Sequence, residues 1–185
     1  MSLPSTFSSQ RVIRGNVETA AYPAASGYQI NAGDMCVFFS GNLYPVSAYG
    51  GVIAWNSGNE IQNWSGARAT FAGVALGQNN SYSYTSGSVT TALGGVAEYP
   101  YPAVSGATLM PGTFVGFTQD QTSGYFNPQE MMQCSGASTA IGKIVEPEYA
   151  YISGAGYQSG LTFGPGTNTI KVEFQSFLVF GGVAN

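Results

Sequence analysis

Short apolar runs separated by glycine-rich turns recur along this chain and constrain its fold more than any other feature. Runs of about four to eight residues bounded by Gly, Pro, Asn or Ser are typical of β-strands. The runs that we predict as strands are 28–30, 35–39, 52–55, 69–76, 88–93, 95–99, 113–117, 140–145 and 169–175. We therefore predict an all-β fold: a single small β-barrel or sandwich of short antiparallel strands, with an extended N-terminal arm and long loops.

The last run has the clearest pattern. Residues 169–175 alternate polar and apolar side chains along their whole length. Successive side chains of a strand point to opposite faces, so this alternation places Ile170, Val172 and Phe174 on a buried face. Lys171 and Glu173 are then predicted to face solvent.

One segment has the start signals of a helix instead. Asn127 is a suitable N-cap residue, Pro128 follows at the first helical position, and Glu130 stands at the third. These signals predict a helix of about two turns through Met131 and Met132.

The first 20 residues differ from the rest of the chain. Residues 1–20 are rich in Ser and include Arg11 and Arg14. Their low apolar content predicts an arm that is disordered alone and orders against a partner, or else an ordinary frayed terminus. Residues 21–185 are predicted to form the β-barrel domain. Long loops are predicted at 78–88 and 147–166, and loops of this length usually carry function or contact a partner.

Charged residues are unusually few. They make up 8% of the 185 residues, against about 25% in an ordinary soluble domain. Association surfaces are depleted in Lys, Glu and Asp and enriched in aromatics, so we expect much of this surface to face other protein. The alternative from composition is a neutral, secreted, glycine-rich β protein. The net charge of −4, with only 5 Lys and Arg residues, argues against a nucleic-acid partner.

Membrane and export signals are not recognisable in the sequence. No apolar run approaches the roughly 18 residues that a membrane span needs. The N-terminus lacks the early positive charge and continuous apolar stretch of a secretory signal. We therefore expect no membrane partner, and a chain that stays in the cytosol where it is made.

The residue types that carry most chemistry are scarce. The chain has no histidine, which removes the commonest general base and the commonest metal ligand. Cys36 and Cys134 stand beside apolar neighbours and are predicted to be buried free thiols. Asp34 is predicted to cap a turn before the 35–39 strand. We expect no cofactor, no metal ion and no enzymatic activity.

A carboxylate pair is the remaining catalytic candidate. Glu146 and Glu148 would share one face of a strand, as the two carboxylates of a glycosidase require. Pro147 between them breaks that strand, which favours two solvated acids near a turn.

Residues 136–143, GASTAIGK, superficially resemble a phosphate-binding loop. That loop needs four residues between its glycines and a Ser or Thr after its lysine, whereas here Ile144 follows Lys143. The pattern of 140–145 is that of a strand.

Aromatic rings and two Asn-x-Ser triplets leave glycan chemistry as a further alternative. The triplets begin at Asn63 and Asn79, and without a signal sequence we interpret them as chance matches. Exposed aromatic rings of 44–64 and 147–163 would suit a sugar-binding platform, but a β core uses the same residues and is the interpretation we favour.

The order of five of these segments resembles that in a known family. They are FAGVALGQ (71–78), GGVAEY (94–99), LMPGTFVGF (109–117), AIGKIVEP (140–147) and IKVEFQSF (170–177). Together they resemble the small β-barrel capsid cement, or decoration, proteins of tailed bacteriophages. The matching positions are Gly73, Val74, Ala75, Gly95, Val96, Gly112, Val115, Ala140, Gly142, Lys143 and Val172. The resemblance spans roughly residues 28–180. The N-terminal arm, the 147–166 segment and the chain length depart from the family pattern.

The resemblance implies a protein that binds the outer surface of an assembled phage head and reinforces it, commonly as a homotrimer. Its partner would be the major capsid protein, its location the outer capsid surface of the virion, and no catalytic residue is carried over. We assign capsid contact to Arg11, Val12, Ile13 and Arg14, because an extended segment can add a strand to a neighbour's sheet. The two arginines would pair with acidic groups on the shell.

Three alternatives belong to other functional classes. The first is a carbohydrate-binding or adhesin module that uses the aromatic rings. The second is a glycosidase that uses Glu146 and Glu148. The third is another virion part, such as a tail or fibre component.

Overall fold

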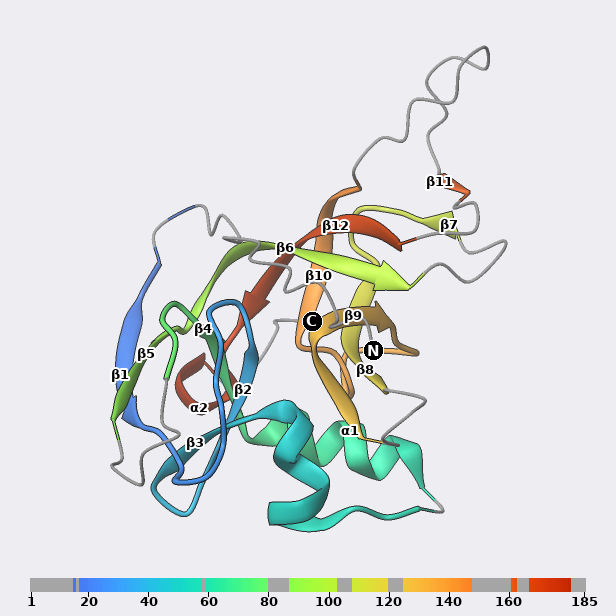
Figure 1. Cartoon of the computed structure of the whole chain (residues 1–185). Helices are drawn as coiled ribbons and strands as arrows, with labels where there is room; N and C mark the ends of the chain where they lie inside the picture. Colours follow the sequence, from blue (N-terminus) through green and yellow to red (C-terminus); the bar gives the residue numbers. More distant parts are fainter. Residues whose placement is uncertain are drawn as a thin grey trace, which may run out of the picture.

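Two antiparallel sheets dominate the structure, which is a computed structural model (Figure 1). It describes residues 15, 17–57, 59–79, 87–102, 108–119, 125–147, 161–162 and 167–180. Each of the two sheets has five strands, and a third pairing joins two short strands. The predicted all-β barrel or sandwich fold is confirmed.

The first sheet curls on itself. Its order is β1 (Thr19–Pro23), β5 (Ser88–Ala92), β4 (Phe71–Ala75), β2 (Met35–Phe39) and β3 (Asn42–Pro45). Just after β1, Ala24 forms an isolated bridge with Leu43 in β3, the strand at the opposite edge. The Ala25 N–H donates to the Leu43 C=O at 2.9 Å, so the two edges of the sheet meet at this end.

The second sheet contains most of the longer strands. Its order is β6 (Gly94–Pro102), β12 (Thr167–Gln175), β10 (Gly142–Pro147), β8 (Phe114–Gln119) and β9 (Phe126–Gln133). Its edge strands β6 and β9 contact each other, so this sheet also curves. β7 (Thr108–Leu109) pairs with β11 (Leu161–Thr162), which places a short strand inside the predicted 147–166 loop. The described residues do not include 148–160 and 163–166 of that loop, nor 80–86 of the 78–88 loop.

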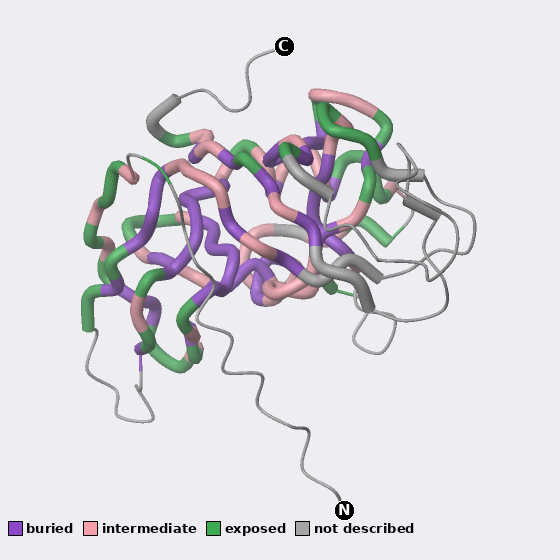
Figure 2. The backbone as a smooth tube through the Cα atoms, turned by 90° about the horizontal axis from the view of Figure 1, so that it is seen from above, coloured by how far each residue is buried: buried purple, intermediate pink, exposed green. Residues whose placement is uncertain are grey.

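One hydrophobic cluster receives side chains from both sheets. Phe71 of β4 packs edge-to-face against Phe117 of β8, with ring centroids 5.8 Å apart, and against Phe174 of β12 at 6.3 Å. Figure 2 shows buried stretches running through the interior of the molecule, with exposed residues towards its periphery. Apolar burial of this kind is the main favourable term in folding, and here it holds the two sheets together.

A second, smaller cluster lies on the other face of the first sheet. It contains Ile30, Cys36, Leu43, Ala72 and Val89, among others. β4 therefore has both faces buried, which explains why its sequence FAGVA is continuously apolar instead of alternating.

The alternation predicted for the last strand is confirmed. Ile170, Val172 and Phe174 are fully buried, while Glu173 is exposed and Lys171 is half-buried. β12 pairs with β6 along its whole length and with β10 on its other side, so it is central in its sheet.

The helix predicted at 127–132 is wrong, because this segment is β9. Asn127 pairs with Thr118 and Met131 with Phe117, so residues 128–130 bulge out of the ladder. The Asn127 side chain accepts a hydrogen bond from the Gln129 N–H at 2.9 Å, which makes a turn within the strand rather than a helix cap. Pro128 fits this bulge, because a bulged position needs no ladder N–H.

The strand predicted at 52–55 is also wrong. Val46–Ala48 form a 3-10 turn (η1), and Gly50–Ala54 form a short π-helix (η2). Nor does 28–30 form a strand, since within it only Ile30 is bridged, to Asn79. The π-helical turn packs beside β9: a side chain at Gly50 would collide with the Tyr125 ring.

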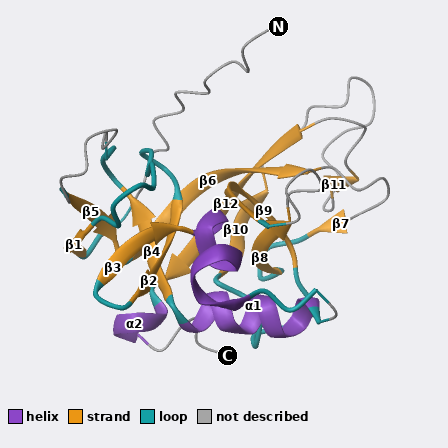
Figure 3. Ribbon diagram, turned by 60° about the horizontal axis from the view of Figure 1, so that its bottom comes forward, coloured by secondary structure: helices purple, strands orange, loops and turns teal. Residues whose placement is uncertain are grey.

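The longest helix of the described residues, α1 (Glu60–Ala69), was not predicted from the sequence. The Asn59 side chain caps it by accepting from the Gln62 N–H at 3.1 Å. Gly66 lets the helix lie close to the Tyr49 hydroxyl, which a side chain at that position would meet. A shorter helix, α2 (Phe177–Phe180), follows β12, and Figure 3 shows the helical segments gathered at one end of the sheets.

Candidate functional site

The residues predicted to contact a capsid, Arg11, Val12, Ile13 and Arg14, lie outside the described residues. The described chain continues through Val17, which packs against the main core, into β1. Thr19 and Ala20 of the predicted 1–20 arm are therefore already paired in a sheet.

β1 is an edge strand of the first sheet. The Glu18 C=O accepts from Leu93 at 2.8 Å and the Ala24 N–H donates to Gly87 at 2.7 Å, so these groups face β5. Hydrogen bonds alternate along an antiparallel pair, so the backbone groups of Thr19 and Ala21 point away from β5. Along 19–23, β5 is the only strand of the described residues that pairs with β1. The structure thus has an open strand edge next to the predicted arm.

The carboxylate pair is only partly within the described residues. The backbone of Glu146 lies in β10 opposite Lys171, where a bulge after Ile144 shifts the register. β10 ends at Pro147, as expected from its ring, and Glu148 lies outside the described residues. The pair therefore stays a prediction. Among the residues that the structure describes, no group of three or more His, Cys, Asp or Glu side chains is placed to hold a metal ion.

The most buried carboxylate of the described residues is part of a polar contact between the sheets. Asp34 is 1% exposed, and its carboxylate accepts from the Asn31 N–H at 2.7 Å and from Gln129 Nε2 at 2.8 Å. The Tyr99 hydroxyl donates to the neighbouring Gly33 C=O at 3.2 Å. We call this set of contacts the Asp34 clasp. Asp34 does cap the turn before β2, as predicted, but its bond to β9 was not foreseen.

Both cysteines are free and buried, as predicted. Burial raises the pKa of the Cys36 thiol well above its ordinary value. Burial also raises the pKa of Cys134, although nearby Arg68 acts in the opposite direction. Because the thiolate is the nucleophile, neither thiol is set up for covalent chemistry.

These raised pKa values predict unreactive thiols in the native protein. At neutral pH both cysteines remain in the thiol form, so we expect Ellman's reagent to react with neither until the protein is unfolded in guanidinium. A time course of thiol titration with and without denaturant measures this. Rapid modification of the native protein at neutral pH would contradict the burial of these groups.

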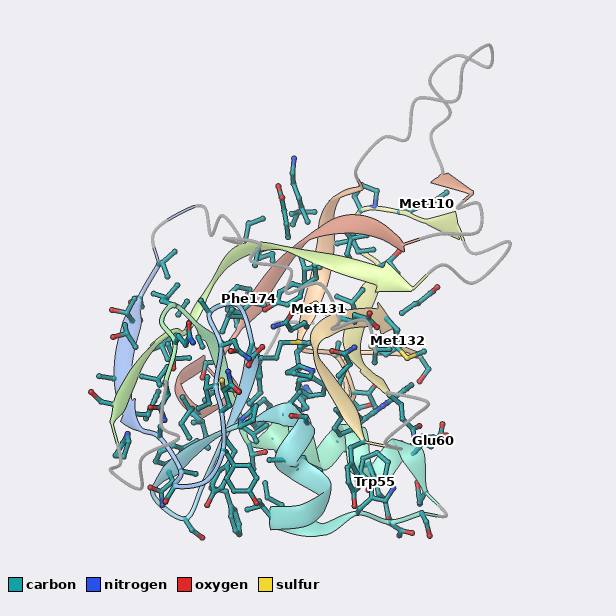
Figure 4. The ribbon with its side chains drawn as sticks, viewed as in Figure 1. Trp55, Glu60, Met110, Met131, Met132 and Phe174 are labelled. Atoms are coloured by element: carbon teal, nitrogen blue, oxygen red, sulfur yellow. The ribbon has the colours of Figure 1, made fainter. Side chains whose placement is uncertain are left out.

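The aromatic residues of 44–64 belong mostly to the core. Tyr49 is buried, and Tyr44, Trp55 and Trp64 are partly buried and pack against the main cluster. Trp55, labelled in Figure 4, lies 5.2 Å from the Phe126 ring, measured between centroids. These contacts favour the core interpretation over a sugar-binding platform for this segment.

The Asn63 side chain, which begins the first glycosylation triplet, is buried and hydrogen-bonded. Asn63 is 3% exposed, and its amide is used twice by the backbone of Asn56: Oδ1 accepts at 2.9 Å and Nδ2 donates at 3.0 Å. Asn79, the start of the other triplet, is also buried. Neither asparagine is therefore presented as a glycan acceptor.

Several large apolar side chains remain exposed on separate elements. They are Phe39, Ile61, Leu76, Met110, Tyr125, Val145 and Leu178. Figure 4 shows Met110 at the end of the second sheet, far from Trp55 near the helices. Isolated exposed apolar residues are normal on a surface and define no site by themselves.

Comparison with protein-family models, with curated proteins and with solved structures found no match to this chain. No helix in the described ranges has the length and apolar character required to cross a bilayer.

Proposed function

We propose that this chain is a decoration protein of a tailed bacteriophage, which binds the outer surface of the assembled head and stabilises it. It acts as a homotrimer without enzymatic activity, and its partner is the major capsid protein. The observation that carries the proposal is the order of the five segments quoted above. Each of them overlaps a strand, namely β4, β6, β8, β10 and β12 in that order.

The scarcity of charge supports a surface that faces other protein. With 8% charged residues, little desolvation cost opposes burying this surface against a shell. Weak contacts suffice where they are repeated over a shell by a multivalent protein. Binding only to the assembled head then opposes disassembly by mass action.

The open edge of β1 supports a role for the N-terminal arm. An extended segment beside an unpaired strand edge is suited to strand addition, in which backbone hydrogen bonds supply the affinity. The proposed contact residues 11–14 directly precede this edge.

Removing residues 1–14 is expected to weaken binding to empty heads by at least about tenfold, equivalent to about 1.4 kcal/mol. The deletion stops before Val17 and β1 because a longer one, through residue 20, would also remove part of a paired strand. Co-sedimentation with purified heads over a protein concentration series measures the occupancy. The full-length variant Lys171→Gln, which removes one positive charge where the deletion removes Arg11 and Arg14, tests how strongly net charge alone affects binding.

Equal occupancy by the shortened and full-length proteins would contradict the arm's role. Failure of the full-length protein to bind heads at saturating concentration would overturn the proposed function itself. Specific binding on a glycan array in that case would favour the carbohydrate-binding module instead.

A further inference from the structure

Arg68 is a half-buried cation held in a fixed position. It lies in the last turn of α1, where Nε donates to the Ala140 C=O at 2.9 Å. Its guanidinium carbon lies 4.6 Å from the centroid of the Phe177 ring in α2. α1, α2 and the loop before β10 thus meet at this side chain.

The guanidinium has more donors than these contacts use. It carries five N–H groups, and one of them, on Nε, is bonded to Ala140. Across the described ranges Arg68 forms no ion pair with a carboxylate. The nearby ionisable group is the Cys134 thiol, which stays neutral because burial raises its pKa.

A partly desolvated cation without a counter-charge is unfavourable. Burial lowers the pKa of Arg68, which reflects the cost of removing water from its charge. The C-terminal end of α1 offsets part of this cost, because helix C-termini favour cations. A carboxylate placed against the free N–H groups would compensate more of it and would form the strong, charge-assisted hydrogen bonds of this pair.

The Arg68 side chain is also oriented in advance for pairing with a carboxylate. Stacking on Phe177 and the bond to Ala140 orient the planar guanidinium before any partner arrives, so little side-chain entropy is lost on pairing. Leu178, the residue after Phe177, is 41% exposed and supplies an apolar contact beside the charge. Arginine next to apolar area is a common composition for the energetic centre of an interface.

We propose that Arg68, stacked on Phe177, is an anchoring site for a carboxylate of a protein partner. Resting on the proposed function, that carboxylate belongs to an Asp or Glu side chain on the outer surface of the major capsid protein. A nucleic-acid phosphate fits less well, because the chain carries a net charge of −4 and would repel a polyanion.

The test compares variants of the full chain for binding to empty heads. Arg68→Gln, which keeps a donor for Ala140, is expected to bind about tenfold more weakly or worse, and with a smaller salt dependence. Arg68→Lys, which keeps the charge but loses the planar fork, is expected to be intermediate. Lys171→Gln removes the same charge from β12 and is expected to bind within about twofold of the wild type. Thermal unfolding of each variant confirms that it is folded, and Arg68→Lys decides the comparison if Arg68→Gln does not fold.

If Arg68→Gln folds and binds heads with the affinity and salt dependence of the wild type, the inference is overturned. If Arg68→Gln does not fold, the same result with Arg68→Lys would overturn it. Where the wild type does not bind heads, the decisive measurement is a sodium acetate titration followed by the NMR signals of Arg68 Nε–H and the Ala140 amide. A saturable shift with acetate, absent with sodium chloride at equal ionic strength, would support a carboxylate site although the proposed function had failed. The same response to both salts would overturn the site as well.

Discussion

Replacing Gly73 with valine is expected to lower the free energy of unfolding by about 3–5 kcal/mol. Gly73 lies in the middle of β4 with a φ of 129°, a conformation that side-chain-bearing residues rarely adopt. A Cβ atom there would collide with the backbone C=O of Ala92 in β5 and lie 3.0 Å from the Thr91 Cγ2. Because the obstacle is backbone, the two strands would have to separate. Chemical denaturation followed by tryptophan fluorescence measures the loss.

Gly77→Ala is the matched control. Gly77 has open space around the position of a Cβ and an ordinary φ, so its replacement should change stability by less than about 0.5 kcal/mol. A Gly73→Val protein as stable as Gly77→Ala would show that β4 and β5 do not approach so closely. A large loss of stability in Gly73→Val alone would give Gly73 of the GVA segment a structural role, which is to let the backbones of β4 and β5 pack closely.

Replacing Asp34 with alanine is expected to cost about 2–4 kcal/mol, because it removes a buried carboxylate that accepts from the Asn31 backbone and side chain and from the Gln129 side chain. The half-buried Asn31 N–H and Gln129 Nε2 would lose the carboxylate oxygens that they now contact. Glu173→Ala, which removes an exposed carboxylate, is the control and should cost less than about 0.5 kcal/mol.

A double-mutant cycle isolates the inter-sheet part of the Asp34 clasp. Asp34→Ala, Gln129→Ala and the double variant should give a coupling energy of about 1–2 kcal/mol, as expected for a hydrogen bond to a charged group. A coupling near zero, with Asp34→Ala still destabilising, would mean that the carboxylate acts only on its own turn. In that case the polar part of the clasp between the sheets would depend on the Tyr99–Gly33 hydrogen bond instead of the carboxylate.

The strands could be predicted where one side chain pattern determines the outcome. Polar and apolar side chains alternate so regularly in β12 that only one face of the strand can be buried, the face of Ile170, Val172 and Phe174. β4 could be recognised from its apolar run, but the second cluster on its other face could not, because only the curl of the sheet creates that space. The predicted capsid-contact residues 11–14 lie outside the described residues, so that prediction remains for the deletion experiment.

Helix starts show the limit of local signals. Asn59 and Asn127 both precede residues that suit a first helical turn, and both accept a backbone hydrogen bond. Only Asn59 begins a helix. Asn127 follows Phe126, whose ring is buried against Phe117, and the pairing of β9 with β8 holds it extended. Tertiary packing therefore outweighed a propensity worth only about 1 kcal/mol.

The features that could be predicted from the residues alone are local or compositional: short strands set by alternation and glycine, buried free thiols, and a surface poor in charge. Contacts between distant segments emerge only in the folded molecule, such as Asp34 with Gln129 and Arg68 with Ala140, which are 95 and 72 positions apart. Hydrophobic patterning is read along the chain because each strand carries its own period. A hydrogen bond between sheets depends on how the strands are arranged in space, and the hydrophobic period of a single strand does not predict that arrangement.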